Sequence, residues 1–198
     1  MQRPSRPGGT TRWQRIALFD DAVLPEIHRD DAATATAMIT VAAVMFISSL
    51  GGFFWYLAED GHDKLAFFLE SVIVGTALAT GMFFVWIGIV AGIAGQIGGS
   101  DHAALRATVR TLSFASVPFA FSSLIFIPGL AYPITLIAIA LLVISTTLAT
   151  QIATGRPTGR ALGVNLVGFF LWTAVMSTLM SPSNAFAPAV FLWERFAV

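Results

Sequence analysis

Four polar side chains stand out because they fall inside or at the edge of long apolar segments: Glu70, Gln96, Gln151 and Asn165. A carboxylate within a membrane can carry a proton or bind a cation, and an amide can bind a solute or join two helices. Glu70 follows Lys64 by less than two helical turns, which places it only about 9 Å from that charge at 1.5 Å per residue. We therefore expect Glu70 to be a hydrated carboxylate at the membrane surface, with a transport role as the alternative.

The three amides fall near one predicted membrane surface. Gln96 follows the second apolar segment, Gln151 ends the fourth, and Asn165 opens the fifth. We expect Asn165 to form a polar packing patch with Gly163 and Gly168, and to have Gln96 and Gln151 as partners. Together with the carboxylate above, these amides make up a possible polar membrane site.

The rest of the sequence offers no catalytic or metal-binding pattern. The chain has no cysteine, which excludes disulfides and thiolate ligands. His28, His62 and His102 each lie beside an acidic residue, and none forms an i, i+4 pair with another ligand. No phosphate-binding glycine loop and no HExxH or GxSxG motif is present. We therefore expect that the protein is not an enzyme, that it has no cofactor and no metal, and that it binds lipid.

The composition indicates that membrane-spanning helices position these residues. The chain is 56% hydrophobic and 11% charged, whereas soluble domains carry roughly 25% charged residues. The zero net charge gives no attraction to nucleic acid. The uncharged run from Thr111 to Gly155 is too long for one crossing and contains a turn sequence at 128–133. We predict an all-α integral membrane bundle of five transmembrane helices, at about 34–57, 68–95, 110–127, 131–152 and 161–180.

The basic residues predict the orientation of the bundle. With five spans, nine of the eleven basic residues share one side, and only Lys64 and Arg195 lie on the other. Because basic residues remain in the cytoplasm, we expect a cytoplasmic N-terminus and an external C-terminus. Three spans with a re-entrant hairpin at 110–152 would give the same sides, and Pro118 makes the third span irregular. We favour full crossing.

Two flanking segments are amphipathic. We expect residues 1–31 to form a cytoplasmic segment with an interfacial amphipathic helix, 32–181 the membrane domain, and 182–198 an amphipathic tail on the outer face. Pro25 would break or restart the first helix. Ordinary packing against the bundle is the alternative for both flanks. The apolar positions are Trp13, Ile16, Phe19, Val23 and Ile27 at one end, and Phe191, Leu192, Trp193 and Phe196 at the other.

Small residues follow one face of the second predicted span. Ala77, Gly81, Gly88 and Gly92 are spaced by four, seven and four residues. Such small-xxx-small spacing allows another helix to approach closely. We predict a helix-packing face here, whose partner lies either within the chain or in another subunit.

Three segments resemble bacterial members of the Yip (Ypt-interacting protein) domain family. They are the amphipathic segment at 17–37, the segment Leu105–Pro118 before a short span, and Thr158–Asn165 at the start of the last span. The resemblance covers about 17–180 and implies a five-span bundle with a cytoplasmic N-terminus, in the inner membrane of a bacterium. Eukaryotic relatives act in vesicle traffic and bind prenylated small GTPases. This sequence lacks the long acidic or aromatic N-terminal domain of many such relatives, which weakens the expectation of GTPase binding.

These observations predict a non-catalytic membrane scaffold or membrane-organising protein that acts through helix–helix packing. One alternative is an accessory structural subunit of a larger respiratory or photosynthetic membrane complex, suggested by the 17 phenylalanines. A second alternative is a small transporter or channel that uses the polar site. The expected partners are membrane lipid and other membrane subunits, or a second copy of the chain.

Overall fold

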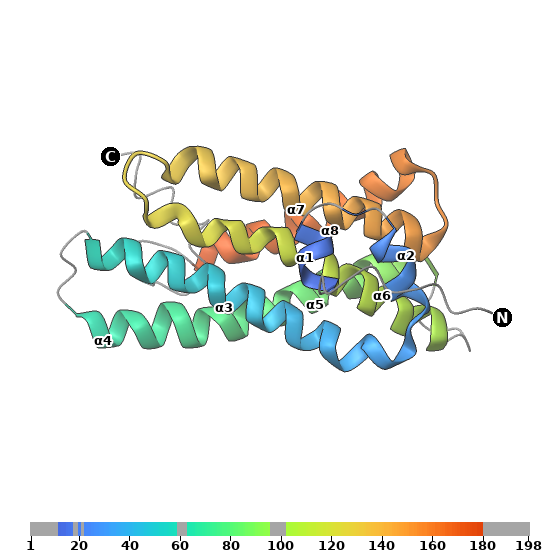
Figure 1. Cartoon of the computed structure of the whole chain (residues 1–198), viewed down its shortest axis with the longest axis horizontal. Helices are drawn as coiled ribbons and strands as arrows, with labels where there is room; N and C mark the ends of the chain where they lie inside the picture. The colour runs from blue at the N-terminus through green and yellow to red at the C-terminus, as the bar shows by residue number, and fades with distance from the viewer. Residues whose placement is uncertain (1–11, 18–19, 21, 59–62, 96–101, 180–198) are drawn as a thin grey trace.

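The computed structural model shows a bundle of long, roughly parallel and antiparallel helices (Figure 1). It describes residues 12–17, 20, 22–58, 63–95 and 102–179. Within these ranges, five helical segments are long and apolar enough to cross a membrane. The predicted all-α bundle of five spans is therefore confirmed, and the protein is a multi-pass membrane protein.

Two short helices, α1 (Arg12–Ala17) and α2 (Val23–Arg29), precede the five spans. The spans themselves combine several helical elements, because three of them change their helical type along their length. In chain order they are η1 (Asp31–Ala33) with α3 (Thr34–Ala58); α4 (Lys64–Phe67), the π-helix η2 (Phe68–Val74) and α5 (Gly75–Ile93); α6 (His102–Ala115) with the 3-10 helix η3 (Val117–Phe126); α7 (Ala131–Thr154); and α8 (Thr158–Leu179).

The ends of the helices follow local chemistry. The Asp63 carboxylate accepts a hydrogen bond from the backbone N–H of Ala66 and caps α4. Gly129 has a φ of +75° in the turn before α7, and Gly155 has a φ of +63° just after it. Only glycine adopts this left-handed conformation without strain, so these two positions fix where α7 begins and ends.

The third span crosses the full length of the bundle, so the re-entrant alternative is wrong (Figure 1). It begins at His102, eight residues earlier than predicted, because its first three turns are an amphipathic helix that includes Arg106 and Arg110. Its last ten residues form η3, which starts next to Pro118. A 3-10 helix rises about 2 Å per residue, so this segment covers more distance than an α-helix of equal length.

Aromatic side chains fill the centre of the bundle. Trp86 of α5 is 1% exposed, and its ring centroid lies 5.1 Å from Phe83, 5.7 Å from Phe169 and 6.0 Å from Trp172. Phe119 of η3 lies edge-on to Trp172 at 5.8 Å. This cluster joins α5, α8 and η3. The two tryptophans are tilted by 37° to each other, and the other three pairs have the edge-to-face geometry that aromatic rings prefer.

Two glycines allow neighbouring segments to approach closely. A Cβ on Gly51 of α3 would lie within 2.7 Å of the backbone carbonyl carbon of Ser123 in η3. A Cβ on Gly168 of α8 would lie 2.6 Å from Nε1 of Trp86. Both glycines are buried, and neither position has room for a larger residue. They bring α3 against η3 and α8 against the aromatic cluster.

We call residues 12–29 the N-terminal strap, and their apolar side packs against the bundle. Ile16, Val23, Leu24 and Ile27 belong to the main hydrophobic core, and Trp13 lies edge-on to Phe114 of α6 at 6.2 Å. The alternative expectation of packing against the bundle is therefore confirmed for these residues, and the interfacial position of the helix stays a prediction. Helix α1 ends at Ala17, and α2 begins at Val23. Pro25 lies in the first turn of α2, where a proline is tolerated. Phe19 and the tail at 182–198 lie outside the described residues.

Candidate functional site

The four residues of the possible polar membrane site do not come together. Glu70 lies on η2, near the end of the bundle that carries α4, and its side chain is exposed. Gln151 and Asn165 lie toward the opposite end, where α1, α2 and the α7–α8 turn gather (Figure 1). We call this the basic end. Gln96 lies outside the described residues.

Asn165 is the deepest polar residue of this set. It is 0% exposed, and its Nδ2 donates to Thr146 Oγ1 at 2.9 Å and to Thr147 Oγ1 at 3.1 Å, both on α7. The prediction that Gln96 and Gln151 are its partners is therefore wrong for Gln151, which instead accepts from Thr158 Oγ1 at 3.4 Å. The Asn165 amide joins α8 to α7 and has the role of a helix-packing contact.

The glycines beside Asn165 have different surroundings. Gly168 is buried against Trp86, as described above, whereas Gly163 is exposed and a Cβ added there would meet no atom within 4 Å. The predicted patch of three residues thus contains one close contact and one open position. α8 uses one side for packing and leaves the other outside the bundle.

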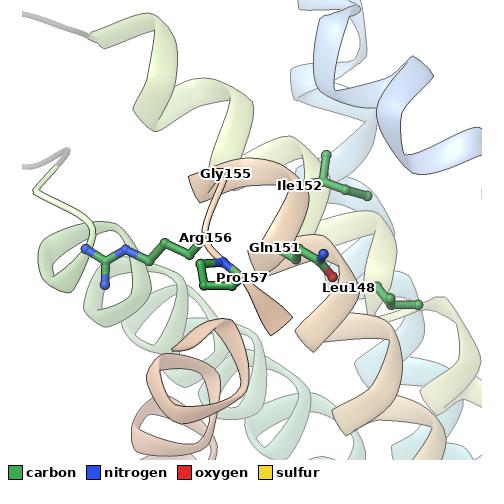
Figure 2. A pocket seen from close by; sticks show the side chains of 6 residues that line it. All are labelled: Leu148, Gln151, Ile152, Gly155, Arg156 and Pro157. Carbon is green, nitrogen blue, oxygen red and sulfur yellow. The ribbon is translucent and has the colours of Figure 1, made fainter. Parts of the chain in front are cut away.

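A groove at the basic end follows the α7–α8 turn (Figure 2). Its volume is about 680 Å³, and it is open to the surroundings. Figure 2 shows the Arg156 side chain extending away from Gln151, and its Nη2 donates to the carbonyl of Ile93 at 2.8 Å, which ties the turn to the end of α5. Among the described residues, no carboxylate, imidazole or hydroxyl side chain lines this groove. The lining residues are Leu148, Gln151, Ile152, Gly155, Arg156 and Pro157.

Arg110 is a buried charge, whereas the sequence indicates only that it lies on the side of the membrane with most of the basic residues. Its side chain is 3% exposed, and Nη1 lies 2.7 Å from the Asp31 carboxylate, which is itself 85% exposed. Nη2 donates to the His28 carbonyl at 2.8 Å, and Nη1 to Thr34 Oγ1 at 3.2 Å. Arg110 therefore pins α2 and the start of α3 to α6. One sequence feature is consistent with this contact: Asp31 and Arg110 each border a long uncharged run on the same predicted side of the membrane.

His28 joins the same contact through its ring. Its Nδ1 lies 3.1 Å from Thr111 Oγ1, and that hydroxyl already donates its proton to the Ala107 carbonyl at 2.7 Å. Thr111 must therefore accept from His28, which places the proton of the neutral ring on Nδ1. Burial, together with the charges of Arg110 and Arg29, lowers the pKa of His28 below its ordinary value of 6.5. The neutral ring is the form that suits this site.

Ion pairs on the outer side of the strap connect α1 to α2. Arg15 donates to Asp20 at 2.7 Å and to Glu26 at 2.8 Å, and Arg12 pairs with Asp30. The hydrogen bond from Arg15 lowers the pKa of Asp20, and the one from Arg12 lowers the pKa of Asp30. Because these pairs are partly exposed, each stabilises the strap only weakly.

The small residues of α5 face outward. Ala77, Gly81 and Gly92 are exposed, and a Cβ on Gly81 or Gly88 would meet no atom within 4 Å. Val85, 46% exposed, lies on the same face, and we call these five residues the outward stripe. The predicted packing face therefore has no partner helix among the described residues. The remaining possibilities are a partner in another polypeptide, lipid, or a segment of this chain outside the described residues.

The chain was also compared with known proteins. No protein-family model, no curated protein and no solved structure matches it. Its resemblance to the Yip domain family therefore stays a prediction. Among the described residues, no group of three or more histidine, aspartate or glutamate side chains is arranged to hold a metal ion.

Proposed function

We propose that this protein is a non-catalytic integral membrane protein that organises its membrane by holding a transmembrane helix of a partner against α5. The observation that carries the proposal is the contrast between the two sides of α5. One side buries Phe83, Trp86 and Val90 in the core, and the other presents the outward stripe with open space over Gly81 and Gly88.

Membrane helices associate mainly through close packing, because lipid chains are as apolar as leucine. Small residues favour such packing, since they allow two backbones to approach. A shallow groove of about 340 Å³ runs beside the stripe, between α3 and η2–α5. Thr76 and Thr80 supply hydroxyls to it, and Ala42 and Phe46 form part of its wall. The stripe and this groove together offer a partner helix both a flat surface and a recess for side chains.

The polar residues give less support to transport. Transport sites usually gather polar groups near the membrane midplane. Here Glu70 is exposed at one end of the bundle, and Asn165 is bonded to two threonines toward the other. An accessory subunit of a larger complex would use the same stripe, so the identity of the partner distinguishes that role from a general scaffold.

The proposal is tested by enlarging one stripe residue. We expect Gly88→Leu to abolish stable association with a partner in mild-detergent extracts of native membranes, measured by native electrophoresis and quantitative mass spectrometry. Ala140→Leu is the matched control, because Ala140 is an exposed small residue on a different span, α7. Because the chain has no cysteine, Val85→Cys provides a single crosslinking position on the stripe.

The expected pattern has three parts: one defined partner crosslinks to Val85→Cys, Gly88→Leu loses it, and Ala140→Leu keeps it. Extraction of two differently tagged copies together would identify that partner as a second copy of the chain. A monomer with no crosslink from position 85, or equal loss in both leucine variants, would overturn the proposal. We further propose that the basic end faces the cytoplasm, which impermeant labelling of a cysteine at position 103 or 157 would test.

A further inference from the structure

Two buried polar atoms in the centre of the bundle have complementary chemistry and no hydrogen-bond partner among the described residues. One is Nε1 of Trp86, a donor, and the other is Oδ1 of Asn165, an acceptor. Their residues are 1% and 0% exposed. A buried polar group without a partner costs about 1–3 kcal/mol, so two such groups on the contacting helices α5 and α8 call for an explanation.

The orientation of the Asn165 amide is fixed by its neighbours. Both nearby hydroxyls donate to backbone carbonyls, Thr146 to Leu142 and Thr147 to Val143, each at 2.6 Å. These hydroxyl oxygens can therefore only accept from Asn165, which requires its NH₂ group on that side. The carbonyl oxygen must then point away from α7, and rotating the amide by 180° would place acceptor against acceptor.

The two unpaired atoms belong to side chains that border the same turn of α8. The Trp86 nitrogen is 2.6 Å from where a Cβ on Gly168 would be, and Gly168 follows Asn165 by three residues on α8. Cβ positions three residues apart on a helix are about 5–6 Å apart. The indole N–H therefore borders the same turn of α8 as the Asn165 side chain, which is an arrangement that one small molecule can bridge.

We propose that Trp86 and Asn165 hold a single internal water molecule that accepts from the indole N–H and donates to the amide carbonyl. Buried waters in proteins make two to four hydrogen bonds to groups that would otherwise be unsatisfied. A water here links α5 to α8 and, through Asn165, to α7. The ligand class is water or a molecule of similar size, because both residues are buried.

Trp172 provides a control within the same aromatic cluster. Its Nε1 donates to the Ala79 carbonyl at 3.5 Å, and it lies 6.0 Å from Trp86 between ring centroids. The two indoles therefore share similar surroundings and differ in whether the chain supplies an acceptor. Any signal that reports general hydration of the core would appear at both.

The test is proton-detected solid-state NMR of the full chain in lipid bilayers, with ¹⁵N-labelled tryptophan. We expect a water cross peak at the Trp86 indole N–H, assigned through its loss in Trp86→Phe, and none at Trp172. In Asn165→Leu the cross peak should disappear. Water-to-carbon transfer to the labelled Asn165 side-chain carbonyl gives the same information in the wild type, should that variant not fold.

Each alternative result would overturn the proposal. A Trp86 indole without a water cross peak would mean that the site is dry or that the two side chains bond directly. Equal cross peaks at Trp86 and Trp172 would indicate diffuse hydration. A cross peak that persists at Trp86 in a folded Asn165→Leu protein would show that Asn165 does not hold the water.

Discussion

Glycine has opposite roles on the two sides of this bundle. At Gly51 and Gly168 the missing side chain is replaced by a neighbouring segment, so the glycine is part of the packed interior. At Gly81 and Gly88, no atom of the described chain occupies the equivalent space. The second pair has the spacing associated with helix packing, and yet the first pair makes the contacts. Spacing alone therefore predicts that a helix can be approached closely, and does not predict from which polypeptide the approaching helix comes.

The largest effect is expected at Gly51. Gly51→Ala places a methyl group against the backbone of Ser123, which cannot rotate away, so α3 and η3 must separate. Overpacking typically costs 1–3 kcal/mol, and we expect about 3 kcal/mol here because the obstacle is main chain. Equilibrium unfolding in mixed detergent measures the loss. A Gly51→Ala protein as stable as the wild type would contradict the proposed difference between tightly packed glycines and glycines that face open space.

Gly168→Ala should have the next largest effect. The added methyl meets the indole of Trp86, a side chain that can shift within the aromatic cluster. We expect a loss of about 2 kcal/mol, at the middle of the range for overpacking. The same unfolding measurement checks it, and near-ultraviolet circular dichroism should show the altered packing of Trp86. If Gly168→Ala cost more than Gly51→Ala, the argument that a side chain relaxes more easily than backbone would be wrong.

Acidification should destabilise the packing of α2 against the bundle, by less than either of the two glycine substitutions. The pKa of His28 is lower in the folded protein than its ordinary value of 6.5, so the unfolded state binds the proton more readily. The contribution of neutral His28 is therefore fully present above about pH 6.5 and is lost as the pH falls through its folded pKa. The protection factors of the α2 amides, which correct for the intrinsic exchange rate, should therefore fall as the pH is lowered from 7.5 to 5.5.

His28→Asn is the control for this pH dependence, because its amide can still donate to Thr111 and does not titrate in this range. The pH dependence of exchange in α2, corrected for the intrinsic rate, should become flat in this variant. An unchanged dependence would assign the effect to a group other than His28.

The open side should tolerate the same substitution. Gly81→Ala adds a methyl group where no described atom lies within 4 Å, and alanine is favoured over glycine in helices by up to about 1 kcal/mol. We expect unchanged or slightly increased stability of the purified protein in detergent. A clear loss of stability would mean that the outward stripe is already covered in the purified state, for example by a second copy of the chain.

The smallest effect is expected at Glu70. Its side chain is exposed, and a hydrated carboxylate contributes little to stability. Glu70→Gln should therefore leave the unfolding midpoint nearly unchanged. Ion flux in reconstituted vesicles that depends on Glu70 in a folded protein would contradict this and favour the transport alternative.

The five spans could be predicted because each depends on local composition. Long uncharged runs and the turn at Pro128–Gly129 define the helices without knowledge of their neighbours. The predicted start of the third span is wrong, because the charges of Arg106 and Arg110 are typical of a loop between two spans. The structure places Arg110 inside a contact with α2, which only the tertiary arrangement reveals.

The candidate site was harder to predict for the same reason. Asn165 was recognised from its position in an apolar segment, and its partners were chosen by residue type, as amides. The actual partners are the threonines Thr146 and Thr147. Each hydroxyl donates to a backbone carbonyl of its own helix and still has a lone pair that accepts from Asn165. Likewise nothing in the sequence separates Gly168 from Gly163, since the difference is the presence of Trp86 from another span.

The contact made by Arg110 also has a consequence in time. Its partners, the His28 carbonyl and Thr34, are 82 and 76 residues earlier in the chain. The strap is synthesised before the first span, but the residue that pins it emerges only with the third. Contacts of such long sequence separation form late, because the intervening chain must first be ordered. The docking of the strap therefore reports that the first three spans have assembled, and it would be among the last steps of their folding.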